Sequence, residues 1–175
     1  MPGRIAVVDD ANRFVRWEDR RVIHAQRLVH RSVHILVFDS AGRLLLQRRH
    51  PAKETNPRYW DVSVAGHVEE SDYPAGPDDD LDAVYAAVAA RELLEELGVT
   101  AEIERLARLG PEPGVHYEQI HLFRATSDGP FTPQADEVEE VRLVTRPELE
   151  ALLGSGEPAT SSLRHLASKL MPRLW

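Results

Sequence analysis

The sequence predicts an α/β (α+β) fold, because strand patterns outnumber helical ones and the two kinds of segment are interspersed along the chain. The clearest strand signal is a hairpin in which two apolar runs, residues 33–38 and 44–47, flank the turn DSAG. The clearest helical signal covers residues 81–97, where apolar side chains recur at helical spacing. The 175 residues suffice to bury a core and are expected to form a single domain, residues 1–175.

The first third of the chain reads mainly as strands. RIAVVDDANRFV predicts two short strands joined by a turn at residues 9–12, and residues 17–29 are expected to form a helix or turn. In the hairpin that follows, Gly42 is suited to a positive φ. After a polar loop, residues 60–65 alternate between apolar and polar side chains, which predicts one half-buried strand.

The acidic loop before residue 81 ends in aspartates suited to cap the long helix, and Gly98 stands just past that helix. Three further strands are expected within residues 100–110, 116–126 and 136–145, with the turn SDGP between the last two. Pro147 suits the first turn of a helix, and an amphipathic helix is expected to close the chain.

Composition excludes several functions. The chain carries 21 basic and 29 acidic residues, a formal net charge of −8, which argues against binding a nucleic-acid polymer. It contains no cysteine, so disulfides, zinc–thiolate sites and thiol catalysis are excluded. The first residues lack the apolar run of a signal peptide, and no segment approaches the ~20 apolar residues of a membrane span. A cytoplasmic protein without membrane contact is therefore expected.

RELLEELGV, residues 91–99, gathers acidic side chains near the end of the long helix. At about 100° per residue, Glu92, Glu95 and Glu96 share one arc. The side chains predicted for the opposite, buried face are Ala86, Ala90, Leu93, Leu94 and Leu97. Like charges at this spacing repel each other, and the helix dipole disfavours anions at this end. Either the face is simply solvated, or it serves Mg²⁺ or Mn²⁺, which prefer oxygen ligands.

RELLEELGV is similar to the second half of the Nudix box, which runs Arg, Glu, aliphatic, any, Glu, Glu, any, Gly, aliphatic. The glycine that opens this box resembles Gly66 in SVAGHVEE, at the end of a predicted strand. YWDVSVAGHV resembles the branch that holds isopentenyl diphosphate isomerases and their hydrolase relatives. The resemblance covers residues 6–153 and implies a Nudix-type α/β/α sandwich with a mixed central sheet.

The box-like segment, residues 66–99, departs from the family pattern. The pattern has glycine fourteen residues before the arginine, whereas 25 positions separate Gly66 from Arg91. An insertion of about eleven residues near residues 70–80 is therefore inferred, and its acidic composition suggests a lid. The glutamate that the box has eight residues before its arginine falls on Ala83, with Asp82 beside it.

Two alternatives to a hydrolase follow from the resemblance. The isomerases carry a catalytic cysteine where this chain has Ala65, and a Glu-x-Glu pair of which only Glu118 is present, with His116 at the first position. An isomerase-like enzyme is thus disfavoured. A nucleotide-sensing module that does not cleave its ligand is the other alternative, although such modules usually lose box glutamates.

The resemblance implies metal-dependent hydrolysis of a pyrophosphate bond in a nucleoside diphosphate derivative or related diphosphate, with Mg²⁺, or alternatively Mn²⁺, as cofactor. The implied ligands are Glu92, Glu95 and Glu96, helped by the main-chain carbonyl of Gly66. Arg91 would orient these carboxylates through a salt bridge. Glu118 would be a further ligand or the general base.

Other side chains are weaker candidates. Glu139 and Glu140 are rivals of Glu118, and Arg48 and His67 are candidate substrate contacts. The eight histidines show no local metal-binding spacing such as His-Glu-x-x-His. The expected partner is a small-molecule diphosphate, and the sequence leaves open whether the chain forms a homodimer.

Overall fold

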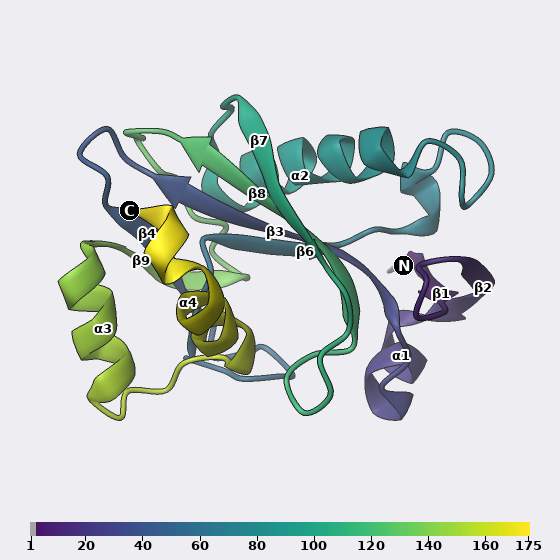
Figure 1. Ribbon diagram of the computed structural model, residues 1–175, viewed down its shortest axis with the longest axis horizontal. Coiled ribbons are helices and arrows are strands. Elements are labelled where there is room, and N and C mark those ends of the chain that lie inside the picture. The colour runs from purple at the N-terminus through teal and green to yellow at the C-terminus, as the bar shows by residue number, and fades with distance from the viewer. Residues whose placement is uncertain (1–2) are drawn as a thin grey trace.

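One mixed sheet organises the computed structural model, which describes residues 3–175 (Figure 1). Its strands are β1 (Arg4–Val8), β2 (Phe14–Asp19), β3 (His30–Phe38), β4 (Leu44–Arg49), β5 (Trp60–Asp61), β6 (Val64–His67), β7 (Ile103–Leu109), β8 (Glu118–Thr126) and β9 (Val138–Val144). The helices are α1 (Arg20–Gln26), α2 (Leu81–Leu97), α3 (Arg146–Gly154) and α4 (Ser161–Leu174), with a short 3₁₀ turn at Glu70–Asp72.

Strand β3 is the centre of the sheet. It runs parallel to β8 along its whole length, from the pair His30 and Glu118 to the pair Phe38 and Thr126. It is antiparallel to β1, β4 and β6, while β7 extends the sheet beyond β8 and β9 extends it beyond β4. The start of β3 therefore lies beside the start of β8 and the end of β6, two segments that are far apart in sequence.

Helices cover both faces of the sheet, as Figure 1 shows for α2 on one side and α3 and α4 on the other. Alternation along β3 explains this arrangement. Val33, Ile35 and Val37 belong to the core beneath α2, whereas Leu36 and Phe38 belong to the core beneath α3 and α4. The predicted α/β/α sandwich is confirmed. None of the helices in residues 3–175 is long and apolar enough to cross a membrane.

The strongest local predictions are confirmed. Helix α2 spans Leu81–Leu97, the residues expected from periodicity. Gly98 takes the left-handed conformation with φ 70°, and its N–H donates to the carbonyl of Leu94 at 2.9 Å. Gly42 turns the β3–β4 hairpin with φ 78°.

The strand predicted for residues 60–65 is wrong in two respects. It is divided into β5, which pairs with β4, and β6, which pairs with β3. Every side chain from Trp60 to Val64 is buried, because neighbouring segments cover both faces. The buried polar Ser63 is satisfied: its hydroxyl accepts from the N–H of Val37 at 2.8 Å and donates to the carbonyl of Leu45.

Two loop predictions are also corrected. Asp80 precedes α2 in a left-handed conformation with φ 43°, and its side chain makes no cap hydrogen bond. The connection between β8 and β9 is longer than the expected turn, because it also covers the end of α2. There, the N–H groups of Thr132 and Gln134 donate to the carbonyls of Leu97 and Glu96 at 2.8 and 2.9 Å.

Candidate functional site

A cavity of about 470 Å³ opens between α2, β6, the starts of β3 and β8, and the loop after β4. Seven of the residues proposed from sequence line it: Gly66, His67, Arg91, Glu92, Glu95, Glu96 and Glu118. The fold therefore gathers the acidic helix, the box glycine and the strand glutamate around one space.

Gly66 leaves room on β6 for the Glu92 side chain of α2. A Cβ atom added to Gly66 would lie 2.2 Å from Cδ of Glu92 and 2.5 Å from Oε1, distances that no side chain can occupy. The carboxylate of Glu92 therefore occupies the space that any other residue at this position would fill. This contact explains why a glycine stands at the end of the strand that faces the acidic helix.

The carboxyls of Glu92 and Glu96 lie in the wall of the cavity, away from bulk water. Glu96 is 7% exposed, and its Oε2 accepts a hydrogen bond of 3.1 Å from the Gln47 amide. Burial raises the pKa of Glu96 to about 8, and the neighbouring charge of Glu92 adds to the effect. Burial likewise raises the pKa of Glu92 to about 7, although Arg91 opposes the shift.

The helical arc placed the three glutamates on one face, but in the structure they do not share one solvated face. Glu96 is buried together with Leu93 and Leu97, while Ala90 and Leu94 of the predicted apolar face are exposed. Distant segments hold Glu96 in place: Gln47 of β4 bonds its carboxylate, and Gln134 of the β8–β9 connection bonds its main-chain carbonyl. A carboxylate held in such surroundings requires a proton or a cation.

Arg91 joins the acidic side chains. Its NH1 lies 3.0 Å from Oε1 of Glu92 and 3.0 Å from Oε2 of Glu95, and its NH2 lies 3.1 Å from Oδ2 of Asp72. Asp72 stands six positions after Gly66. Counting eight residues back from Arg91 had instead placed the box glutamate at Ala83, with Asp82 beside it. Sequence reasoning missed Asp72 because the inserted residues follow it.

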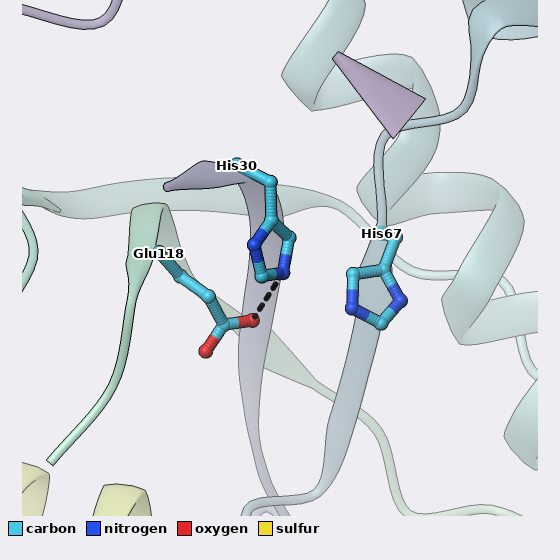
Figure 2. Close-up of side chains that lie close together, drawn as sticks. All are labelled: His30, His67 and Glu118. Carbon is cyan, nitrogen blue, oxygen red and sulfur yellow. Dashed lines mark ion pairs between the residues drawn. The ribbon is translucent and has the colours of Figure 1, made fainter. Parts of the chain in front are cut away.

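A second donor set lies in the same cavity. Sequence reasoning named Glu118 as a ligand or base and His67 as a substrate contact, but missed His30 and the grouping of the three. Figure 2 shows His30, His67 and Glu118 converging from β3, β6 and β8, with potential ligand atoms all within 4.8 Å of one another. His30 Nε2 lies 3.8 Å from Glu118 Oε1. The parallel pairing of His30 with Glu118, and the pairing of Ser32 with His67, bring them together.

The chemistry of this set fits a metal ion. His30 Nδ1 lies 2.8 Å from the carbonyl of Leu28, and its Nε2, on the cluster side, is buried without a hydrogen-bond partner among the described residues. Burial and the nearby His30 lower the pKa of His67 well below its usual range. Burial opposes ionisation of Glu118, but His34 and His30 outweigh it and lower the pKa. A neutral imidazole and an ionised carboxylate are the ligand forms.

Strand alternation directs two neighbouring arginines to opposite faces. Arg49 lines the cavity, as does Lys53, which is ion-paired with Glu137. Arg48, the predicted substrate contact, is absent from the described residues that line the cavity. Its guanidinium lies 5.6 Å from the centroid of the buried Trp60 ring. The same group pairs with Glu139 and Glu140 at 3.0 and 2.8 Å, so these two rivals of Glu118 are engaged away from the cavity.

Comparison with known proteins agrees with this arrangement. The model of the NUDIX domain matches residues 28–166. An uncharacterized Nudix hydrolase of Pseudomonas aeruginosa is 37% identical over 147 residues, which cover 83% of this chain and 79% of that protein. An isopentenyl-diphosphate Delta-isomerase of Streptomyces avermitilis is 36% identical over 130 residues, covering 69% and 59%.

Solved structures show the same fold. A Deinococcus radiodurans crystal structure superposes with a TM-score of 0.79 at 24% identity, covering 95% of this chain and 98% of that one. The NUDIX domain of Shewanella oneidensis NrtR, complexed with ADP ribose, gives a TM-score of 0.59 at 18% identity and covers 90% and 100%. Fold, family match and relatives agree: the chain belongs to the NUDIX domain family and is a Nudix hydrolase.

Proposed function

We propose that the protein hydrolyses the pyrophosphate bond of a small diphosphate, in particular a nucleoside diphosphate derivative, with the help of a divalent metal ion. The observation that carries the proposal is the convergence of Glu92, Glu96 and Glu118 on one cavity that also presents Arg49 and Lys53. Buried carboxylates suit a cation, and guanidinium and ammonium groups suit the anionic phosphoryl oxygens of a substrate.

Glu92, Glu95 and Glu96, with the main-chain carbonyl of Gly66, would hold Mg²⁺ or Mn²⁺. The raised pKa values of Glu92 and Glu96 support this assignment, since a metal ion can replace the protons that these carboxyls otherwise retain. His30, His67 and Glu118 form a second donor set, whose imidazoles suit Mn²⁺ or Zn²⁺ better than Mg²⁺. Bound divalent ions would supply charge neutralisation on the diphosphate and a more acidic water.

The protein's own residues would then perform distinct tasks. Arg91 keeps the carboxylates of Glu92 and Glu95 in place through its two 3.0 Å ion pairs. Arg49 and Lys53, which line the same cavity, would bind the phosphate groups. Glu118, ionised at neutral pH, would accept a proton or serve as a ligand.

The comparisons support a nucleotide substrate only at the level of class. The NrtR domain was solved with ADP ribose, a molecule whose two halves are joined by a pyrophosphate bond. Relatives such as the Pseudomonas aeruginosa protein are Nudix hydrolases. The single-domain organisation and the cytoplasmic location stay predictions of the sequence.

The direct test is a panel of nucleoside diphosphate sugars, dinucleoside polyphosphates and simple diphosphates, incubated with Mg²⁺ or Mn²⁺ and analysed by chromatography. Cleavage between two phosphorus atoms, yielding two monophosphate products, is expected for at least one compound. Absence of hydrolysis across the panel, together with tight binding of one compound, would instead indicate the sensing module.

An isomerase is the second candidate, favoured by the similarity to the Streptomyces avermitilis enzyme. The chain lacks cysteine and has Ala65 where the isomerases carry their catalytic thiol. Isopentenyl diphosphate belongs in the same panel for this reason. Conversion to an isomeric diphosphate without release of phosphate would establish the isomerase and exclude the hydrolase proposal.

A further inference from the structure

The cavity has a polar part that none of the contacts proposed above explains. It lies between the sheet and the first turn of α4, and its lining residues are His34, Asp61, Ala65, Thr160 and Ser162. His34, Asp61 and Thr160 are buried, with exposed fractions of 3%, 6% and 4%. We refer to these five residues as the polar subsite. Polar side chains inside a protein are normally paired, so unused hydrogen-bonding groups at a cavity wall point to a ligand.

Strand pairing positions the polar subsite beside the phosphate contacts. His34 pairs with Ala65 across β3 and β6, four residues along β3 from His30. Arg49 NH1 lies 3.3 Å from Oδ2 of Asp61. A group attached to a phosphate at Arg49 would therefore lie next to the Asp61 carboxylate.

The imidazole of His34 has hydrogen-bonding capacity that the protein leaves unused. Its Nδ1 is buried and has no hydrogen-bond partner among the described residues. The facing residue on β6 is Ala65, whose side chain offers no hydrogen bond. A buried donor or acceptor without a partner costs stability, and a ligand hydroxyl at the cavity wall would satisfy it.

Asp61 is anchored and still has acceptor capacity. Its Oδ1 accepts from the Thr160 hydroxyl at 2.8 Å and from the N–H of Val62 at 2.9 Å, while Oδ2 accepts from Arg49 NH1 at 3.3 Å. A carboxylate offers about four acceptor sites, so one stays available to a ligand. Ser162 adds a hydroxyl from the first turn of α4. Together these groups can accept hydrogen bonds from ligand hydroxyls and donate to them.

This chemistry suits hydroxyl groups better than an apolar chain or a second anion. An apolar chain would cover His34 and Asp61 without bonding to them, which leaves buried polar groups unpaired. An anionic group would be repelled by the Asp61 carboxylate. Among the described residues, the aliphatic side chains that line the whole cavity are only Ile23, Leu28, Ala65 and Val115.

We propose that the polar subsite binds an uncharged, hydroxylated group of the substrate, namely a ribose or a hexose carried on the diphosphate. His34, Asp61 and Ser162 are its specificity-determining residues. The assignment rests on the proposed function, which supplies the diphosphate, and it narrows the substrate to sugar-containing diphosphates. It also distinguishes this cavity from one that accepts an isoprenyl chain, because methylene groups cannot satisfy the polar side chains.

Calorimetry with three monophosphates in the presence of Mn²⁺ tests the polar subsite. Ribose 5-phosphate and glucose 1-phosphate carry hydroxyl groups, and n-pentyl phosphate is their apolar counterpart. At least one sugar phosphate should bind about 100-fold more tightly than n-pentyl phosphate, because a site built for hydroxyls rejects analogues that lack them. The tighter of the two sugar phosphates identifies the ribose or the hexose. Equal affinity for all three compounds would overturn the proposal.

Two variants remove the hydrogen-bonding groups one at a time. His34→Leu should weaken sugar phosphate binding by about tenfold without weakening the binding of n-pentyl phosphate. It should be at least as stable as the wild type in thermal unfolding, because it removes a buried atom that has no partner among the described residues. Ser162→Ala should weaken sugar phosphate binding by about threefold.

His121→Leu is the matched control for His34→Leu. His121 is also buried, at 4% exposed, and its Nδ1 likewise lacks a partner within residues 3–175. Its ring stacks on Tyr85, with centroids 3.6 Å apart, and is not part of the described cavity lining. Ser161→Ala, at an exposed position outside that lining, is the control for Ser162→Ala. Both controls should bind the sugar phosphates as tightly as the wild type.

Equal sugar phosphate affinity in folded His34→Leu and His121→Leu would refute the polar subsite. If His34→Leu does not fold, wild-type affinity in Ser162→Ala would refute it instead. The hydrolase assignment can fail separately. A protein that cleaves no diphosphate but binds a sugar phosphate through His34 retains the subsite and loses the hydrolase. A protein that cleaves sugar-containing and alkyl diphosphates with equal kcat/KM retains the hydrolase and loses the subsite.

Discussion

The Gln47 amide on β4 donates a hydrogen bond of 3.1 Å to Oε2 of Glu96 on α2, inside the protein. This bond joins the sheet to the acidic helix at the residue whose burial raises its pKa to about 8. A neutral amide orients the carboxylate without neutralising it. The protein therefore keeps at this point a group that is costly to ionise unless a cation accompanies it.

The stability of the metal-free protein should depend on Glu96 and on pH. Because the pKa is raised on folding, the group contributes most stability below its unfolded pKa and loses that contribution as the pH rises through about 8. At pH 9 the free energy of unfolding of Glu96→Gln should therefore exceed that of the wild type by more than about 1 kcal/mol. One unit of pKa shift corresponds to about 1.4 kcal/mol. The difference should shrink toward pH 5.

Chemical denaturation in the presence of EDTA at pH 5, 7 and 9 measures this effect. Glu95→Gln is the matched control, because the side chain of Glu95 is 53% exposed on the same helix. Parallel pH dependence in the wild type and Glu96→Gln would show that Glu96 ionises freely in the folded protein.

Metal binding should release protons. The pKa values of Glu92 and Glu96, about 7 and about 8, mean that metal-free protein retains protons on these carboxyls at neutral pH. A cation displaces them, so the apparent affinity for Mn²⁺ should rise as the pH rises from 6 to 9. Calorimetry in two buffers of different ionisation enthalpy counts the protons. Buffer-independent enthalpies at pH 6.5 would contradict the prediction.

The sequence predicted those features that depend on residues close together in the chain, and it did not predict those that depend on distant ones. Helix α2 and the hairpin at Gly42 depend on local periodicity and on glycine geometry, and both were predicted from neighbouring residues. The environment of Glu96 depends on distant segments, since Gln47 bonds its carboxylate and Gln134 bonds its main-chain carbonyl. A helical arc cannot reveal such contacts, so the helix alone left open whether the acidic face is solvated or serves a metal ion.

The imidazole cluster illustrates the same limit. His30, His67 and Glu118 have no shared spacing in sequence, and only the pairing of β3 with β6 and with β8 brings them together. Pairing the strands that contain His30 and Glu118 in parallel was the one step from the sequence that could have predicted the cluster. Alternation along β4 could likewise have separated Arg48 from Arg49.

Gly66→Ala should damage the metal site while leaving the fold intact. The added methyl group would lie 2.2 Å from Cδ of Glu92 and must displace that carboxylate. We expect Mn²⁺ affinity to fall by about 10–100-fold, the range seen when metal sites lose their local support. Gly154→Ala is the control, since nothing lies within 4 Å of its added Cβ. Unaltered affinity in a folded Gly66→Ala protein would argue against Glu92 as a ligand.

His30→Gln should separate the two donor sets. It removes an imidazole from the cluster with His67 and Glu118 but leaves the carboxylates of α2 in place. We expect loss of one equivalent of tightly bound Mn²⁺ or Zn²⁺, measured by elemental analysis after dialysis, with Mg²⁺ binding retained. His50→Gln, outside the cavity lining, should keep the full metal content. Equal metal content in the two variants would show that the cluster binds no ion.

The central claim is tested most directly by comparing wild type and Glu96→Gln in the hydrolysis of the best diphosphate of the panel with Mg²⁺. Loss of a metal-ligating carboxylate should reduce kcat by at least about 100-fold, consistent with several kcal/mol of transition-state stabilisation supplied by the metal. Circular dichroism should show the variant folded. Wild-type hydrolysis that EDTA abolishes and that folded Glu96→Gln lacks is the predicted result. Equal rates in the two proteins, or full activity in EDTA, would contradict it.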